Sequence, residues 1–566
     1  MRRMYRLALM AAVSVVSSWG LAMPEVAQGT QEEAIASSQT VDLRPNIIVM
    51  VADDLGWADV GFHGNTEIDT PSLDRLAREG MELNRFYTTP ICSPTRAELM
   101  TGRDAMRLGM AYSVVMPWDN HGVSPEEHFM PESFLAAGYQ TAMMGKWHLG
   151  HSLPGHHPNN RGFEEFVGHL HTEVGFYPPF SREGGNDFQR NGKPITDLPA
   201  DTYETFLMGD EVARYIKERD KSRPFFIYMP FIAPHTPFDA PQDLQDKYKD
   251  INTDLEPARS IGTDGTRLMS KILLQPSARP MYAAVTDGMD QAIGNVLNTL
   301  DEEGLADNTI VLFHSDNGGA SYSVGGADNV PLRGGKGDAY EGGIRVVSVM
   351  RWPEKIKPST KLTDIMTVMD VFPTLAEAAG VEPQNVRKFD GRSLWKSISE
   401  GAPAPRDDFV FFISEIPMKD YFNITGFNDE WKLVQIVDQK QTIVTVENEL
   451  FRLSEDPFEH NDLSEQYPEI VDMIAKKIEA WRGTGPINAV RNSLVPPPGW
   501  RAPKDWTDYI RPEEQLQKVL AETLVESDIE ADKALGHKGR MKYDCTDNWR
   551  ELDSCYQEKI KHYLQQ

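Results

Sequence analysis

The chain has 566 residues, of which 40% are hydrophobic and 25% are charged, as in an ordinary globular protein. This length predicts either one large hydrophobic core or two cores of medium size. The formal net charge of -28 argues against a general nucleic-acid binder, which needs a basic face. An anionic substrate would therefore have to be held by a local cluster of cationic side chains.

The N-terminal residues have the pattern of an export signal. Three arginines within the first six residues precede an apolar stretch from about Leu7 to Val16, and small residues follow. An uncleaved membrane anchor is the alternative, but this stretch is short against the roughly 20 residues that a span needs. We therefore expect a signal peptide over residues 1–28, export to the periplasm or the medium, and no stable membrane span.

Three apolar runs predict strands that are buried on both faces, as in a parallel sheet. They extend from Pro45 to Ala52, from Pro224 to Ile232 and from Thr309 to Phe313. Helical patterns occupy residues 72–79 and 285–303 between them. This alternation predicts an α/β fold, with a large and mostly parallel sheet flanked by helices, over residues 44–404.

Polar side chains follow each apolar run. Asp53 and Asp54 follow the first run, His235 follows the second, and Asp316 and Asn317 follow the third. Sites in open α/β sheets lie beyond the carboxyl ends of the strands, so we expect these residues to converge. Each short motif alone is more often a turn or a helix cap. Together, the four carboxylate and amide side chains are an all-oxygen set suited to a hard divalent cation.

The pattern changes beyond residue 404. Short strands over residues 409–413 and 431–436, followed by a helix over 468–481, predict a smaller α+β domain at residues 405–490. Pro-Pro-Pro-Gly at 496–499 then marks a break. Residues 512–535 have a helical pattern, so we expect a helical C-terminal extension over residues 491–566.

The most informative run begins at Cys92 and reads Cys-Ser-Pro-Thr-Arg-Ala-Glu-Leu-Met-Thr-Gly-Arg. Pro94 suits the first turn of a helix, where its missing N–H costs nothing. Cys92 would then lie near free backbone N–H groups at the positive end of the helix dipole, where anions bind. Arg96 adds a planar cation suited to a tetrahedral oxyanion. A small buried cysteine before an ordinary helix is the alternative.

Two further blocks carry cationic side chains. Gly-Lys-Trp-His-Leu-Gly begins at residue 145, and residues two apart on a strand share a face, so Lys146 and His148 can reach one pocket. Pro-Leu-Arg-Gly-Gly-Lys ends at Lys336. Arg333, in the same run, is a weaker candidate for the site, and a residue in a solvated loop is the alternative.

These blocks, in this order, resemble those of the sulfatase family, whose signature is Cys-x-Pro-x-Arg with a Thr-Gly-Arg extension. The resemblance spans roughly residues 44 to 480 and is closest to the arylsulfatase B, or N-acetylgalactosamine 4-sulfatase, branch. It implies an alkaline phosphatase-like fold and a sulfuric ester hydrolase. It also implies a sulfated sugar or polysaccharide as the substrate.

The resemblance implies two cofactors. A formylglycine-generating maturation enzyme would convert Cys92 to 3-oxoalanine (formylglycine), whose hydrate attacks sulfur. Ca²⁺ would be bound by Asp53, Asp54, Asp316 and Asn317, together with the modified residue 92. Mg²⁺ is the alternative, although it prefers a stricter octahedral geometry.

The resemblance also implies roles for the remaining site residues. Lys146, His235 and Lys336 would bind the sulfate group, and Arg96 would stabilise the charge on the nucleophile. Asp316 would be the base that activates this nucleophile. His235 or Lys336 would protonate the leaving alcohol, and His148 would deprotonate the second hydroxyl of the hydrate.

Two other functions remain open from the sequence. One is a phosphonate or phosphate ester hydrolase of the same superfamily, because its substrates are also tetrahedral anions. The other is a catalytically silent glycan-binding homologue. If Cys92 is modified, Cys545 and Cys555 remain, and they either form a disulfide in an oxidising compartment or stay as two unpaired thiols.

Overall fold

The computed structural model describes part of the chain between residues 44 and 509. Within that part it leaves out residues 113, 173, 181–184, 252–277, 322–325, 385, 405, 407, 415–420, 439–444, 487–495 and 497–498. The expected signal peptide, the helix over residues 512–535, Cys545 and Cys555 lie outside the described residues. No helix in the described part is long and apolar enough to cross a membrane.

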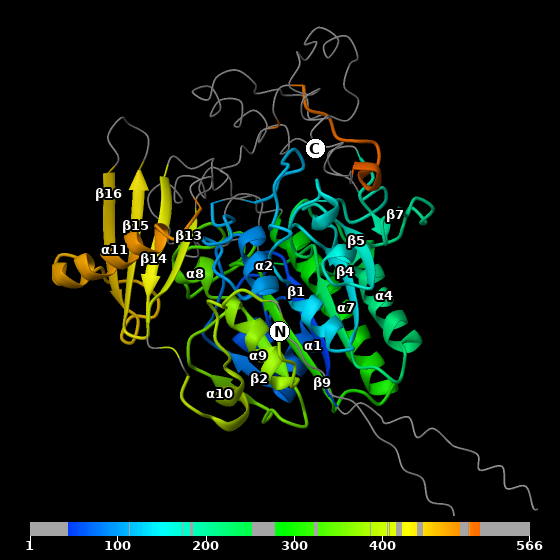
Figure 1. Cartoon of the computed structure of the whole chain (residues 1–566), viewed down its shortest axis with the longest axis horizontal. Helices are drawn as coiled ribbons and strands as arrows, with labels where there is room; N and C mark the ends of the chain where they lie inside the picture. The colour runs from blue at the N-terminus through cyan, green and yellow to red at the C-terminus, as the bar shows by residue number, and fades with distance from the viewer. Residues whose placement is uncertain are drawn as a thin grey trace, which may run out of the picture. The chain divides into compact units, whose positions relative to one another are not determined.

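A ten-stranded mixed sheet forms the centre of the described chain (Figure 1). Its strand order is β11-β2-β10-β9-β1-β8-β4-β5-β6-β7. The strands are β1 (Asn46–Ala52), β2 (Met81–Leu83), β4 (Gln140–Lys146), β5 (Glu165–His169), β6 (Gln189–Arg190), β7 (Lys193–Pro194), β8 (Phe225–Pro230), β9 (Thr309–Ser315), β10 (Ser348–Arg351) and β11 (Thr360–Leu362). The adjacent strands β9, β1, β8, β4 and β5 are all parallel, which confirms the expected fold class.

The apolar runs form the central strands because both faces of this sheet are covered by helices. Along β1, Ile48 and Met50 enter one hydrophobic cluster, whereas Ile47 and Val49 enter another on the opposite face. The first cluster includes residues of α1 (Pro71–Glu79), α4 (Glu204–Glu218), α5 (Gln242–Tyr248) and α7 (Ala278–Glu302). The second includes residues of α2 (Cys92–Thr101), α3 (Met130–Ala136), α9 (Val371–Ala378) and α10 (Trp395–Glu400). Figure 1 shows α4 and α7 to one side of β1 and α9 to the other.

A smaller antiparallel sheet follows in sequence, as expected. It contains β13 (Val410–Ser414), β14 (Tyr421–Phe427), β15 (Trp431–Asp438) and β16 (Thr445–Arg452), in that order. Helix α11 (Pro468–Arg482) packs on this sheet, because Ile474 and Ile478 share a hydrophobic cluster with Ile424 and Leu433. The domain boundaries that we place at residues 404 and 490 stay predictions.

Candidate active site

The metal-binding candidates lie at the carboxyl ends of β1 and β9. These two strands are parallel neighbours, and Ala52 pairs with Ser315 at their ends. The residues that follow therefore lie beside one another, and the Asp316 amide donates to the Ala52 carbonyl at 2.9 Å. Asp54 has a φ of 71°, a left-handed conformation that aspartate tolerates better than most residues. Strand register thus brings two acidic motifs together that are far apart in sequence.

Helix α2 begins at Cys92 itself, so the expected helix is confirmed and Pro94 lies in its first turn. The Cys92 side chain is buried, with 2% of the residue exposed. Burial raises the pKa of the Cys92 thiol, which keeps it protonated at neutral pH and makes it a poor nucleophile. The Ser93 hydroxyl donates to the His148 carbonyl at 2.9 Å and accepts from the Val115 amide at 3.1 Å. These bonds join the start of α2 to the loop that carries His148.

Arg96 connects the helix to both acidic motifs. Its Nη2 atom lies 2.8 Å from Asp316 Oδ2 and 3.2 Å from Asp53 Oδ2, and all three side chains are fully buried. Its Nη1 atom donates to the Lys146 carbonyl at 3.1 Å. Removing this buried arginine would take away an ion-pair partner of both Asp316 and Asp53, so this contact orders the centre of the site.

Two lysines contact the acidic motifs from other elements. Lys146, the last residue of β4, is buried and bonds to Asp53 Oδ2. Its Nζ atom also donates to Thr172 Oγ1 at 2.8 Å. Lys336 Nζ lies 2.7 Å from Asp54 Oδ1. Sequence reasoning missed Thr172, although its position just past β5, at the same edge of the sheet, was a usable signal.

The two predicted histidines lie at opposite sides of this group. His235, in the loop after β8, places Nε2 3.6 Å from Asp54 Oδ2. Burial and the neighbouring Lys336 lower the pKa of His235 to about 4. His148 is buried, and its Nε2 faces the Val115 carbonyl at 3.0 Å. Burial, Lys146 and Arg96 hold the pKa of His148 well below its ordinary value.

We expected Lys146 and His148 to lie on the same face of one strand, and this expectation was wrong. Strand β4 ends at Lys146, and His148 lies in the following loop with a φ of 61°. The two residues still reach one site, because the left-handed turn redirects the chain beyond the end of the strand. Hydrophobic periodicity carries no information about such a turn.

The charged groups at the centre of the site shift one another's pKa values. Burial alone would raise the pKa of Asp53, but the positive charges around it, Lys146 foremost, outweigh burial and hold that pKa well below its ordinary value. Burial and the adjacent charge of Asp53 raise the pKa of Asp316 to about 7. A set of carboxylates packed this closely favours positive charge nearby.

The oxygen atoms of this group fit a hard divalent cation. Asp53 Oδ1 and Asn317 Oδ1 are buried and have no hydrogen-bond partner among the described residues. Asn317 donates from Nδ2 to Asp54 Oδ1 at 2.7 Å, which orients its own carbonyl oxygen away from that contact. Candidate ligand atoms of Asp53, Cys92 and Asp316 lie within 4.8 Å of one another. Unpartnered buried oxygens are rare in proteins and are expected where an ion binds.

The structure brings together all of the predicted site residues, but Arg333 is not in a solvated loop. Its guanidinium lies 2.9 Å from Glu449 Oε2 of β16 and 4.0 Å from the centre of the Tyr340 ring. Only 12% of its side chain is exposed. Arg333 therefore connects the loop before Lys336 to the C-terminal sheet.

Comparison with known proteins decides the family. The sulfatase family model matches residues 45–381. The chain belongs to the sulfatase family. A model described as N-sulphoglucosamine sulphohydrolase, C-terminal, matches residues 336–484 of this sulfatase. The predicted family and the predicted class of enzyme, a sulfuric ester hydrolase, are therefore confirmed.

Several relatives of this sulfatase have named activities. Arylsulfatase J of Mus musculus is 30% identical, over 78% of this chain and 76% of that protein. N-acetylgalactosamine-6-sulfatase of Homo sapiens is 32% identical, over 65% of this chain and 68% of that protein.

Solved structures share the fold of this sulfatase. The crystal structure of Ps i-CgsB in complex with k-i-k-neocarrahexaose has a TM-score of 0.66 and 26% identity, and covers 87% of this chain and 100% of that chain. Phosphonate monoester hydrolase of Agrobacterium radiobacter has a TM-score of 0.56 and 19% identity, over 78% of this chain and 96% of that chain. The second likeness concerns the fold alone.

Proposed function

We propose that this sulfatase is exported and hydrolyses sulfate esters of a sulfated sugar or polysaccharide, using Ca²⁺ and a formylglycine made from Cys92. The observation that carries the proposal is the position of Cys92 at the start of α2, within reach of the candidate metal ligands Asp53 and Asp316. At this position the protonated thiol is a poor nucleophile. Conversion of the thiol to another group would allow residue 92 to act as the nucleophile.

The donor set supports the proposed ion. Asp53, Asp54, Asp316 and Asn317 would hold Ca²⁺, because two of their buried oxygens lack a hydrogen-bond partner among the described residues. When bound, Ca²⁺ would supply positive charge that polarises sulfate oxygens and lowers the pKa of a coordinated hydroxyl. Formylglycine would supply a hydrated aldehyde, of which one hydroxyl attacks sulfur and the other allows sulfate to be released.

The cationic side chains would bind and stabilise the sulfate group. Lys146 and Lys336 reach the acidic motifs from two sides, so their ammonium groups can also contact sulfate oxygens beside Cys92. Fixed positive charge aimed at developing negative charge usually lowers the barrier to such transfers more than any other single effect. Arg96 would hold the carboxylates in place through its bonds to Asp53 and Asp316. His235 or Lys336 would give a proton to the leaving alcohol.

The orientation of His148 suits a base. Its Nε2 faces the Val115 carbonyl, so this nitrogen carries the hydrogen and donates it. The Nδ1 atom is then the acceptor, and it has no hydrogen-bond partner among the described residues. Because the pKa of His148 is held low, the ring is neutral and the lone pair of Nδ1 is free, but the ring is a weaker base than an ordinary histidine.

Relatives support a sugar substrate. The human relative is named for N-acetylgalactosamine 6-sulfate, and the structure at 26% identity was solved with a neocarrahexaose. The apolar N-terminal stretch that follows three arginines supports export. An exported enzyme can reach sulfated polymers outside the cell.

Mass spectrometry across residue 92 tests the proposal. Protein from a host that has a maturation enzyme should give a peptide about 18 Da lighter than the cysteine form, because an aldehyde replaces the thiol. Cys92→Ala should abolish turnover of an aryl sulfate while the circular dichroism spectrum stays unchanged. Unmodified cysteine in active protein, or turnover retained by C92A, would overturn the mechanism. Equal rates on the phosphate ester of the same phenol would instead favour a phosphate ester hydrolase.

A further inference from the structure

Two loops that carry site residues meet at one buried side chain, Asn329. The first loop follows Asp54, and the second runs from Asn317 past Asn329 itself to Lys336. Asn329 itself is 0% exposed and lies outside every helix and strand of the described chain. The sequence motifs did not include it, and its side-chain amide bonds to backbone groups rather than to the expected metal ligands.

The amide of Asn329 bonds to the backbone of the first loop and to two distant points of its own loop. Its Oδ1 atom accepts from the Gly319 amide at 2.9 Å and from the Trp57 amide at 3.4 Å. Its Nδ2 atom donates to the Gly319 carbonyl at 2.9 Å and to the Gly334 carbonyl at 3.3 Å. A carboxamide is suited to this position because it presents an acceptor and two donors at one end of a short side chain.

These backbone groups lie close in sequence to the site. Gly319 is two residues past Asn317, Trp57 is three residues past Asp54, and Gly334 is two residues before Lys336. The Lys336 amide also donates to the Gly319 carbonyl at 3.1 Å, which is the same carbonyl that Asn329 contacts. A shift of Asn329 would therefore move the oxygens of Asp54 and Asn317 relative to each other.

We propose that Asn329 is a positioning residue that sets the geometry of the Ca²⁺-binding loops. This inference rests on the proposed function, which assigns Ca²⁺ to those loops. Groups that orient metal ligands without touching the metal typically contribute about 10- to 100-fold to metal affinity. Loss of the Asn329 bonds should weaken Ca²⁺ binding by that factor.

Two variants test the inference by isothermal titration with calcium chloride, after chelator treatment and desalting of the full chain. Asn329→Ala removes all of these bonds. Asn329→Asp keeps an oxygen for the two N–H donors but turns its second oxygen toward the Gly319 and Gly334 carbonyls. The added negative charge alone would strengthen Ca²⁺ binding. Weaker binding in both variants, by about 10-fold or more, therefore identifies the lost bridge as the cause.

Asn46 provides a matched control, because it lies at the amino end of β1 and the site lies beyond the carboxyl end of that strand. It is buried at the start of β1, where Oδ1 accepts from the Phe225 amide at 3.2 Å and Nδ2 donates to Thr309 Oγ1 at 3.4 Å. Asn46→Ala and Asn46→Asp also remove a buried asparagine bridge between strands. These variants should lower the melting temperature but keep Ca²⁺ affinity within about twofold of the wild-type value.

The outcomes separate the inference from the proposed function. Wild-type protein that binds no Ca²⁺ would overturn the proposed metal, and the inference with it. Wild-type protein that binds Ca²⁺ while both Asn329 variants bind equally well would overturn the inference alone. Melting temperatures in chelator show whether each variant is folded before titration. If Asn329→Ala does not fold, Asn329→Asp alone tests the inference. Weaker Ca²⁺ binding by this variant supports the inference, and equal or stronger binding overturns it.

Discussion

Glu204, in the first turn of α4, is a buried carboxyl group whose loss of hydration is only partly offset by hydrogen bonds. Burial raises the pKa of Glu204 from its ordinary value of 4.5 to about 8. Its Oε1 atom has no hydrogen-bond partner in the described part of the chain, and His169 Nε2 lies 3.9 Å away. The folded protein therefore keeps this proton over a pH range in which the unfolded chain releases it.

Replacement of Glu204 by glutamine should change how stability depends on pH. Because the folded pKa exceeds the unfolded one, the contribution of Glu204 is present below about pH 4.5 and is lost as the pH rises to about 8, by about 1.4 kcal/mol per unit. Glu204→Gln removes this loss, so the variant should exceed wild type in unfolding free energy at about pH 8 and match it near pH 5. Urea unfolding across this range measures the difference.

Glu218 on the same helix provides the control. Its side chain is 65% exposed and pairs with Arg214. Glu218→Gln should change the unfolding free energy by less than about 1 kcal/mol, because its ion pair is exposed. Parallel curves for Glu204→Gln and wild type would show that the Glu204 carboxyl is ionised in the folded protein.

At the residue scale, sequence identified the site residues that stand in distinctive runs, such as Cys92 and Lys146. It missed Thr172 and Asn329. Both are common polar residues whose contacts, Thr172 with Lys146 and Asn329 with Gly319 among others, come from loop positions beyond the strands. No spacing rule marks them, because their partners depend on how loops far apart in sequence pack together.

At the scale of elements, the C-terminal sheet is joined to the site by a buried ion cluster. Lys432 of β15 is 0% exposed and lies 3.0 Å from Glu341 Oε1 and 2.7 Å from Glu459 Oε1. Glu341 begins the short helix α8 (Glu341–Ile344), in which the Gly343 carbonyl accepts from the Gly318 amide at 2.9 Å. Gly318 follows Asn317, so β15 supports the loop of this candidate metal ligand through α8.

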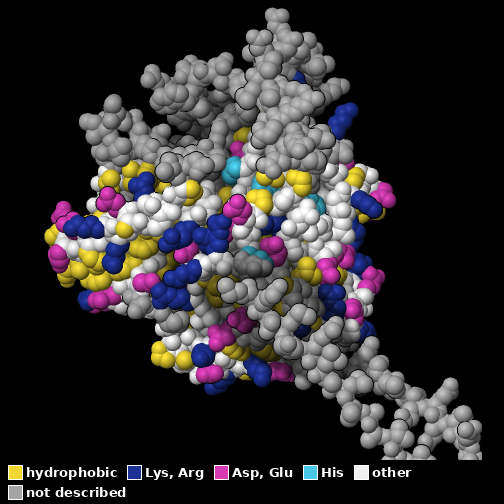
Figure 2. Space-filling view, viewed as in Figure 1, with side chains coloured by type: hydrophobic (Ala, Val, Ile, Leu, Met, Phe, Trp, Pro, Cys, Tyr) yellow, Lys and Arg dark blue, Asp and Glu magenta, His cyan; other side chains and the backbone are white. Residues whose placement is uncertain are grey.

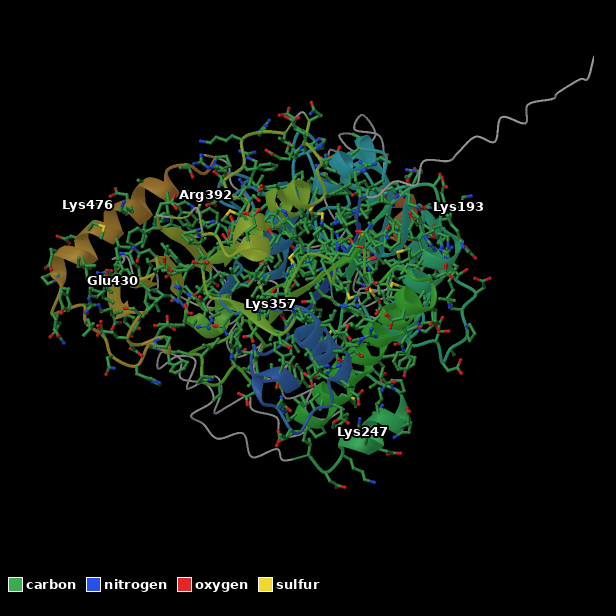
Figure 3. The ribbon with its side chains drawn as sticks, turned by 90° about the horizontal axis from the view of Figure 1, so that it is seen from below. Lys193, Lys247, Lys357, Arg392, Glu430 and Lys476 are labelled. Carbon is green, nitrogen blue, oxygen red and sulfur yellow. The ribbon has the colours of Figure 1, made fainter. Side chains whose placement is uncertain are left out.

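Removal of the positive charge at Lys432 should be strongly destabilising. Lys432→Met removes the cation that lies 2.7 Å from Glu459 and leaves Glu341 with the longer ion pair to Arg345 at 3.7 Å. Breaking a buried pair in this way costs about 3–5 kcal/mol. Denaturant unfolding measures the loss. Lys476 of α11, labelled in Figure 3, is exposed and is the control, because Lys476→Met should cost less than about 0.5 kcal/mol. Similar costs for the two variants would contradict a paired, buried Lys432.

Prediction of the elements succeeded where burial leaves a clear pattern. The runs that became β1, β8 and β9 are almost entirely apolar at their centres because helices cover both faces of the sheet. Strand β16 was not predicted, because its residues Thr-Val-Glu-Asn-Glu-Leu-Phe-Arg place charged and apolar side chains without a regular period. In the described part of the chain it pairs only with β15, the strand directly before it, and this pairing rests on backbone hydrogen bonds that a side-chain pattern does not show.

At the scale of the whole molecule, the net charge of -28 opposes the approach of a polyanion. Figure 2 shows acidic and basic side chains interspersed on one face, without a broad basic surface among the described residues there. The proposed binding of a sulfate group therefore depends on local cations such as Lys146 and Lys336 and not on long-range attraction. A substrate with several sulfates is repelled more than one that carries a single sulfate.

Added salt should consequently favour polymeric substrates. The screening length falls from about 30 Å at 0.01 M to about 8 Å at 0.15 M salt, which weakens repulsion between the protein and a distant sulfate. We expect kcat/KM for an oligosaccharide with several sulfates to rise over this range. The value for a monosulfated aryl ester is the control and should change less. A fall in kcat/KM for the oligosaccharide would show that local attraction dominates its approach.

The burial of Cys92 also bears on whether its proposed conversion comes before or after folding. All ten residues of α2 are buried, and the helix is covered by elements that come later in sequence, including α9. An enzyme that converts Cys92 as proposed would have to reach a residue that is only 2% exposed in the folded protein. The proposed conversion must therefore precede folding, so the time that the chain remains unfolded determines what fraction of the molecules becomes active.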